Sequence, residues 1–364
     1  MSTTMGVEEE FLLIDPATGA PVDAACRVLA RADHPNAPEA LLQPELLQSQ
    51  VESATGICRT LAEVRAQVGA GRRALAAAAG AEGLWLVSTG TPVCPGAAPS
   101  ASPGARFAEI MRTYAGVVAE YQCCGCHVHV GVPDRELAVA VLNHLAPWLP
   151  TLLALSANSP FECGRDTGYA SWRIVTQSRF PGFGTAPWFG SAADYDRQVD
   201  ALVDCGVLAD AHQSFWLARL SSRFPTVELR VADAAATVTE AVLQAALSRA
   251  LVHTALAALA TGREARPVNA QLAAAAVWTA ARYGLRGPGV HLGTGRQAPA
   301  TDLLAELVAW VEPALTESGD LTTVRAALAT LTAEGTGADR QRRAAGAGPL
   351  GVLRMLSEQT RETV

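Results

Sequence analysis

Three short stretches of the sequence place ionisable residues two positions apart among apolar residues. The pairs are Glu8 and Glu10 in GVEEEFLLID, His127 and His129 in CGCHVHVGV, and Glu228 and Arg230 in TVELRVAD. On a β-strand, residues i and i+2 point to the same side of the sheet. Each pair is therefore expected on one sheet face, where burial requires a metal, an opposite charge or water as partner.

These residue types suit a divalent-metal site beside a phosphate. Carboxylates and imidazoles are common ligands of divalent cations, and the planar guanidinium of arginine can bind two phosphate oxygens at once. Several carboxylates with one histidine indicate Mg²⁺ or Mn²⁺, whereas two histidines with one glutamate indicate zinc. Taken singly, the pairs also fit charges on an exposed strand edge, hydrogen-bonded core histidines or a surface ion pair. Together they predict metal-assisted chemistry on a phosphate.

Further glutamates accompany these pairs. Glu52, in PELLQSQVESATG, is a candidate ligand on a strand. Glu45 lies seven residues earlier, so a straight strand would point it to the opposite face, and only a bulge or bend would bring both inward. Periodicity leaves the direction of Glu45 open. Glu9, between Glu8 and Glu10, points to the other face and is expected either to be structural or to support a ligand-binding residue.

The segment from residue 158 to residue 190 is rich in Gly, Pro, Arg and aromatic residues and is long for a passive connection. Long ordered loops often bind ligands. Arg165 and Arg173 are therefore candidates for binding a substrate carboxylate, although scattered arginines also fit a solvated loop. Arginines recur near the C-terminus in GTGADRQRR, where the pattern places Arg340, Arg342 and Arg343 on a solvated face.

Composition narrows the classes of function. The net charge is −7 and no basic stripe with interleaved aromatic residues is present, which argues against nucleic acid as a partner. All 28 Lys and Arg residues are arginine, so chemistry that needs a Schiff-base or P-loop lysine is excluded. Cys123 and Cys126 form a CxxC pair without a second such pair to complete a zinc site. With neither a signal sequence nor a bilayer-length apolar run recognised, we predict a cytoplasmic protein with reduced thiols and no membrane partner.

The order of expected elements indicates an α+β fold. Strands are expected at about residues 5–14, within 44–56, and at 84–90, 125–132, 215–220 and 226–233. Helices are expected at about residues 60–81, 106–122 and 136–157, and almost throughout from about residue 237. One-sided alternation in the strands favours an antiparallel sheet with one functional face, backed by helices. We predict one catalytic domain over residues 1–364 with a helical C-terminal third.

The same stretches resemble the glutamate–cysteine ligase type 2 family, the bacterial carboxylate–amine ligases of the glutamine synthetase-like superfamily. The motifs are GVEEEF, QVES followed by TG, CGCHVHVGVP, ANSPF followed by GRDTGYASWR, TVELRVAD and GTGADRQR, in order from about residue 5 to 343. The resemblance implies an antiparallel sheet whose concave face holds ATP and two or three Mg²⁺ ions, or Mn²⁺ in their place. It also implies that the γ-carboxylate of glutamate becomes an acyl phosphate, which an amine then attacks.

The resemblance further implies roles for individual residues. Arg230 would contact the transferred phosphate, with Glu228 beside it, and His129 would lie on the nucleotide side. Arg173, in GYASWR, would clamp the α-carboxylate of the substrate, and Arg165 is a further candidate for nucleotide binding. The implied metal ligands are Glu8, Glu10, Glu45, Glu52, His127 and Glu228.

The implied activity is that of an ATP-dependent carbon–nitrogen ligase of the EC 6.3.2 type, forming a γ-glutamyl amide, with γ-glutamylcysteine as one candidate product. Its partners would be a small carboxylate such as glutamate, an amine, and further copies of the chain in a homo-oligomer such as a dimer. Departures from the family pattern at residues 90–95, 182–190 and 276–280 leave the amine unidentified. Two alternatives stay open here: a zinc hydrolase using His127 and His129, and a non-catalytic relative that binds ATP or an amino acid.

Overall fold

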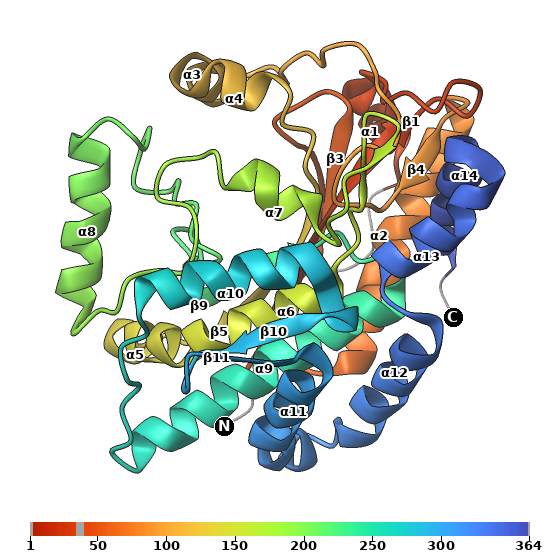
Figure 1. The fold of residues 1–364 in the computed structure, drawn as a ribbon. Helices are drawn as coiled ribbons and strands as arrows, with labels where there is room; N and C mark the ends of the chain where they lie inside the picture. The colour runs from red at the N-terminus through yellow and green to blue at the C-terminus, as the bar shows by residue number, and fades with distance from the viewer. Residues whose placement is uncertain (1–2, 34–39, 363–364) are drawn as a thin grey trace.

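An antiparallel β-sheet forms the centre of the protein (Figure 1). The computed structural model describes residues 3–33 and 40–362, and within them the sheet has seven strands in the order β2, β3, β1, β5, β9, β8, with β4 paired to β1. The strands are β1 (Met5–Ile14), β2 (Leu41–Pro44), β3 (Gln50–Ala54), β4 (Trp85–Val87), β5 (Gly125–Gly131), β8 (Ala218–Leu220) and β9 (Thr226–Asp233). The predicted α+β class with an antiparallel sheet backed by helices is confirmed.

Helices cover one face of this sheet. The long helices α2 and α9 contact β1, and α9 also contacts β5. Alternate strand residues such as Val7, Val128 and Leu229 join these helices in the main hydrophobic core. The helices are α1 (Ala25–Arg31), α2 (Leu61–Ala81), α3 (Ala105–Tyr114), α4 (Gly116–Ala119), α5 (Arg135–Leu145), α6 (Leu149–Ser156), α7 (Trp172–Gln177), α8 (Ala192–Asp204), α9 (Val238–Ala260), α10 (Ala270–Tyr283), α11 (Ala300–Glu317), α12 (Leu321–Glu334), α13 (Gly337–Ala344) and α14 (Gly348–Arg361). The other face of the sheet is thereby left for the polar residues.

Several elements differ from the sequence prediction. The start of α2 is as predicted, because Thr60 and Glu63 form the expected capping box. The helix expected over residues 106–122 breaks at Ala115, whose φ of 44° no helix allows, and helix α8 was not predicted. The C-terminal third, which was predicted to be almost wholly helical, contains a β-hairpin of β10 (Pro288–His291) and β11 (Arg296–Pro299).

Two helical segments of the described chain are long and apolar enough to cross a bilayer by length and composition, at Arg135–Ser156 and Val238–Ala260. Neither segment is an uninterrupted apolar run, since Glu136 lies in the first and Arg249 in the second. In each, 72% of the most apolar window is buried inside the structure. Both segments contribute residues to the core behind the sheet, which accounts for their apolar composition.

The C-terminal motif GTGADRQRR forms α13 and packs into the domain. Arg340 is buried and lies 2.7 Å from Glu240, so the prediction of a solvated face was wrong for this residue. Beside it, the buried side chain of Gln341 donates a hydrogen bond to Asn158 at 2.8 Å. Helix periodicity could not reveal these partners, because both belong to segments distant in the sequence.

Candidate active site

The polar residues that the sequence placed two apart lie on the sheet face that points away from α2. Residues directly paired across neighbouring antiparallel strands share a face. The pairs are Glu10 with Glu52, Glu8 with His127, and His129 with Glu228. The register therefore joins the separate pairs into one row of ionisable groups across β3, β1, β5 and β9.

Glu45 reaches the same face from the turn that follows β2. Its direction was open from the sequence, since a straight strand would point it away from Glu52. In the structure β2 ends at Pro44 and the antiparallel β3 begins at Gln50, so the chain reverses between the two glutamates and strand alternation does not apply. A carboxylate oxygen of Glu45 comes within 4.8 Å of those of Glu10 and Glu52.

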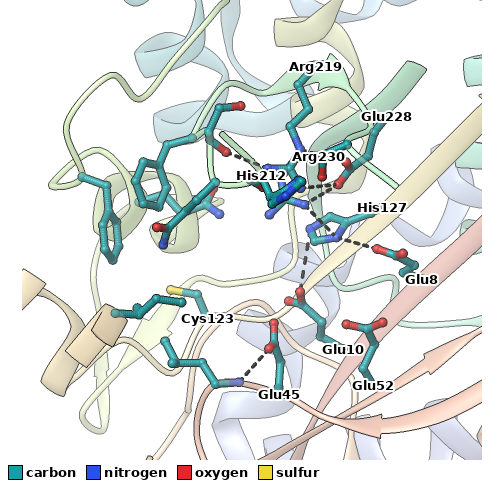
Figure 2. A pocket seen from close by; sticks show the side chains of 18 of the residues that line it. Glu8, Glu10, Glu45, Glu52, Cys123, His127, His212, Arg219, Glu228 and Arg230 are labelled. Atoms are coloured by element: carbon teal, nitrogen blue, oxygen red, sulfur yellow. Dashed lines mark hydrogen bonds and ion pairs between the residues drawn. The ribbon is translucent and has the colours of Figure 1, made fainter. Parts of the chain in front are cut away.

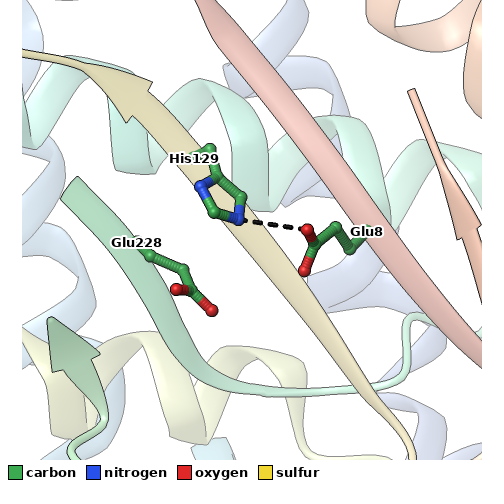
Figure 3. A group of neighbouring side chains, drawn as sticks. All are labelled: Glu8, His129 and Glu228. Carbon is green, nitrogen blue, oxygen red and sulfur yellow. Dashed lines mark ion pairs between the residues drawn. The ribbon is translucent and has the colours of Figure 1, made fainter. Parts of the chain in front are cut away.

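Two groups of three side chains among the described residues have the spacing of metal ligands. We call them the histidine group (Glu8, His129 and Glu228; Figure 3) and the carboxyl group (Glu10, Glu45 and Glu52; Figure 2). Within each group, one ligand atom from each residue lies within 4.8 Å of the other two. Each group can therefore hold one divalent cation.

His127 lies between the two groups (Figure 2). Its Nδ1 atom is 3.4 Å from Glu8 and its Nε2 atom is 3.8 Å from Glu10. The resemblance implied that His127 binds metal and His129 the nucleotide, whereas the geometry places His129 in the histidine group and His127 within reach of both groups. The Nε2 atom of His127 is buried without a hydrogen-bond partner among the residues described, and that of His129 lies 3.3 Å from the carboxylate of Glu8 (Figure 3).

The two groups differ in charge. Burial alone would raise the pKa of Glu228, but the adjacent Arg230 holds it well below its usual value. In the carboxyl group, burial and repulsion from Glu45 raise the pKa of Glu10 to about 8, and burial likewise raises the pKa of Glu45 and Glu52. Three acids that repel one another in a buried place need a cation to ionise together. An all-oxygen site of this kind suits Mg²⁺ or Mn²⁺.

Cation binding by the carboxyl group is expected to strengthen as pH rises. The pKa of Glu10 is about 8 in the metal-free protein, so below that pH a cation must displace a proton, and above it the competition ends. For each displaced proton we expect the dissociation constant of Mg²⁺ or Mn²⁺ to fall by about tenfold from pH 6 to pH 7. Calorimetric titration in two buffers of different ionisation enthalpy measures both the dissociation constant and the number of protons released on binding. An affinity that is constant between pH 6 and 8, without proton release, would contradict this protonation state.

Two arginines neutralise Glu228 at one end of the row. Arg230 forms a short ion pair with Glu228, and the Nε atom of Arg219 lies 2.8 Å from the same carboxylate. Arg219 was not predicted, because its only signal is the register in which it pairs directly with Glu228. Both guanidinium groups line the cavity described below and can contact phosphate.

A β-bulge in β9 sets the direction of Arg230. The register shifts between Cys126 and Val128 of β5, so that β9 has one extra residue there. Bulges re-aim side chains and are frequent beside active sites. Arg173 supports this bulge, since its Nη atoms donate hydrogen bonds to the carbonyls of Arg230 and Val231 at 3.1 and 3.4 Å. Its Nε atom is buried with no hydrogen-bond partner in the described residues, and its Nη1 atom lies 3.9 Å from the buried carboxylate of Asp233.

Arg165 lies apart from the other predicted site residues. It is exposed in a short hairpin of β6 (Phe161–Glu162) and β7 (Arg165–Asp166). Arg165 is not among the described residues that line the cavity over the other site residues. The Gly- and Arg-rich segment instead contributes Arg173 and Gln177 from α7. Helix α7 was not recognised in the sequence because it has only six residues.

A cavity of about 340 Å³ opens over the row of ionisable groups. One side carries the two metal-ligand groups and the arginines, and Figure 2 shows Cys123 near Glu10 and Glu45. The other side is lined by apolar and aromatic side chains from α3, α4, α7 and the segments that follow them. Its aromatic residues are Phe107, Tyr121, Phe180, Phe183, Phe215 and Trp216.

Comparisons with known proteins find relatives over nearly the whole chain. The model of glutamate–cysteine ligase family 2 matches residues 4–362. A Saccharopolyspora erythraea protein provisionally named glutamate–cysteine ligase 2-2 is 56% identical over 360 residues, covering 98% of this chain and 92% of that protein. The crystal structure of glutamate–cysteine ligase from Francisella tularensis in complex with AMP has a TM-score of 0.70 at 13% identity, over 100% of this chain and 89% of that one. A bifunctional glutathione synthetase from Pasteurella multocida has a TM-score of 0.68 at 16% identity, over 99% of this chain and 52% of that one.

Proposed function

Because the chain belongs to glutamate–cysteine ligase family 2, a family of carboxylate–amine ligases, we propose that it uses ATP to join the γ-carboxylate of glutamate to an amine. The observation that carries the proposal is the row of carboxylates and imidazoles that ends beside Arg219 and Arg230. A carboxylate is a poor electrophile at neutral pH, so it must be activated before an amine can attack. γ-Glutamylcysteine is one candidate product.

Activation and attack form two steps. In the first, a carboxylate oxygen of the acid attacks the γ-phosphorus of ATP and ADP leaves, while Arg230 and Arg219 neutralise the charge on the transferred phosphate. In the second, the amine nitrogen attacks the acyl carbon and loses a proton. Phosphate then leaves with an oxygen atom that came from the acid. The sheet holds these groups rigidly, which supplies the positioning that such transfers require.

Divalent cations fit the residues that would hold them. The buried acids of the carboxyl group repel one another, and His127 offers a buried Nε2 atom with no hydrogen-bond partner in the described chain. We assign one cation to the histidine group, on the nucleotide side near Arg219 and Arg230, and another to the carboxyl group. When bound, Mg²⁺ or Mn²⁺ would neutralise phosphate oxygens, a role that no lysine of this chain can take.

The test is an ADP-release assay with Mg²⁺ in which acids are crossed with amines and product masses are measured. We expect ADP release over many turnovers only when both an acid and an amine are present, and a product mass equal to acid plus amine minus water. No ADP release with any combination would overturn the proposal. ATP binding without ADP release would favour a non-catalytic relative, and stoichiometric zinc with ATP-independent activity would favour a hydrolase.

Arg173→Lys is expected to weaken binding of the acid. We propose that the buried Nε atom of Arg173 donates a hydrogen bond to the α-carboxylate of the acid, while its Nη atoms support the bulge. Lysine lacks the planar fork, so the KM for glutamate is expected to rise by about 10- to 100-fold, the effect of one charged hydrogen bond. Kinetics at varied glutamate measure the change, and Arg179→Lys, exposed just after α7, serves as control. A normal KM in a folded Arg173→Lys protein would contradict the assignment.

A further inference from the structure

The side of the cavity that faces the row of ionisable groups presents an aromatic cluster. The rings of Phe180 and Phe215 stack with centroids 4.6 Å apart, and Tyr121 packs edge-on against Phe180 at 4.9 Å. All three line the cavity, and we call them the aromatic wall. Phe180 is buried in the hydrophobic cluster that packs α3 and α4 onto the sheet domain, whereas Tyr121 and Phe215 at the edge of that cluster are only partly buried. Apolar area that faces a substrate cavity gains free energy when an apolar group of the substrate covers it.

The aromatic wall adjoins the carboxyl group. Leu46, the residue after Glu45 of that group, packs against the same hydrophobic cluster as Tyr121, and Arg173 and Gln177 lie one turn apart on α7. The Tyr121 hydroxyl accepts a hydrogen bond from Gln177 of α7 at 2.9 Å, which fixes its orientation. The wall therefore faces the end of the cavity where we assign the acid to Arg173.

Phe224, which packs against His129 of the histidine group, offers a separate aromatic surface for the nucleotide. Phe224 is 54% exposed, and its ring packs edge-on against His129 with centroids 5.9 Å apart. It lines the cavity together with Arg219 and Arg223. A base stacked on Phe224 would have its phosphates near these arginines. The aromatic wall is then free for the second substrate.

We propose that the aromatic wall binds the substituent of the acceptor amine, and that this amine carries an aromatic or bulky aliphatic group rather than the short side chain of cysteine. The inference rests on the proposed ligase function and names its amine substrate. The nitrogen forms the C–N bond, the C–O bond to phosphate breaks, phosphate takes the electron pair, and the nitrogen releases a proton. Contact with the wall favours such amines over small ones by about 10- to 100-fold in kcat/KM.

The test compares phenethylamine, isoamylamine, methylamine and cysteine as acceptors at saturating ATP and glutamate. We expect kcat/KM for phenethylamine to exceed that for methylamine and for cysteine by at least about tenfold. Phe215→Ala is expected to lower the phenethylamine-to-methylamine ratio by about tenfold, mainly through KM. Phe161→Leu, a substitution in a separate hydrophobic cluster, serves as matched control and should keep the wild-type ratio.

The outcomes separate the inference from the proposed function, and the wild-type comparison does not depend on how any variant folds. ADP release with methylamine or cysteine as efficient as with phenethylamine would overturn the inference and leave the ligase function standing. An unchanged ratio in a folded Phe215→Ala protein would also overturn it. No ADP release with any of the amines would overturn the proposed function, and the inference with it.

Discussion

Glu10→Gln is expected to lower turnover by at least about 100- to 1000-fold, the scale seen when a group that stabilises transition-state charge is lost. The same variant is expected to leave the metal-free fold unchanged. At pH 7 the Glu10 carboxyl is largely protonated, because its pKa is about 8, and glutamine resembles the protonated acid in shape and charge. The amide oxygen can still accept the hydrogen bond that Gly125 N–H donates to Glu10 at 2.6 Å. The protonated glutamate and the glutamine therefore differ mainly in that only the glutamate can ionise to bind a cation.

Thermal unfolding with and without Mg²⁺ measures this difference alongside steady-state turnover. Wild-type protein is expected to gain Tm on addition of Mg²⁺, since a ligand that binds only the folded state stabilises it. Without Mg²⁺, the Tm of Glu10→Gln should match that of the wild type within about 2 °C, and adding Mg²⁺ should raise it by less than it raises the wild-type Tm. Glu312→Gln, which removes an exposed partner of Arg325, is the matched control and should behave as wild type. Near-normal turnover of Glu10→Gln would refute the assignment of the carboxyl group to metal.

Arg72→Met is expected to have the largest effect on stability, about 3–5 kcal/mol, because it leaves a buried carboxylate unpaired. Arg72 is fully buried in α2 and holds Glu9 with two hydrogen bonds of 2.9 and 2.6 Å. It also donates hydrogen bonds to the carbonyls of Ala235 and Ala236, in the segment between β9 and α9. This ion pair ties α2 to the back of the sheet, in agreement with the structural role predicted for Glu9.

Urea denaturation of the metal-free protein measures the loss as a lower midpoint. The double variant Glu9→Gln/Arg72→Met removes both charges and should recover part of the stability, since the unpaired carboxylate is the main cost. Arg325→Met, which breaks an exposed ion pair, is the control and should change stability by less than about 1 kcal/mol. A loss below about 1 kcal/mol in Arg72→Met would mean that Glu9 is solvated or protonated in the folded state.

Local features of the site could be predicted from the sequence because they depend on neighbouring residues alone. The limits predicted for β1, residues 5–14, are those observed, since alternation marks the strand and the Asp15 side chain accepts a hydrogen bond from Ala17 N–H in the turn that ends it. The shared face of Glu8 and Glu10 follows from the same alternation. The capping box of α2 involves residues only three apart.

Other features depend on strand register, on where the chain turns or on contacts between distant segments, and the sequence could not predict them. Arg219 belongs to the site because β8 pairs with β9 in a register that sets it opposite Glu228. Glu45 points inward because the chain turns before β3, which strand periodicity cannot show. Arg340 is buried because it forms an ion pair with Glu240, a hundred residues earlier in the sequence. In each case tertiary pairing decides whether a charged side chain faces water.

Phosphorylation of the acid on this sheet face is the central claim, and transfer of labelled oxygen tests it most directly. Glutamate labelled with oxygen-18 in its γ-carboxylate is turned over with unlabelled ATP, Mg²⁺ and the best amine, and the released phosphate is weighed by mass spectrometry. We expect one labelled oxygen in each phosphate, because the acid attacks the γ-phosphorus and its C–O bond breaks when the amine attacks. Amide formed together with unlabelled phosphate, or without ADP, would contradict the account.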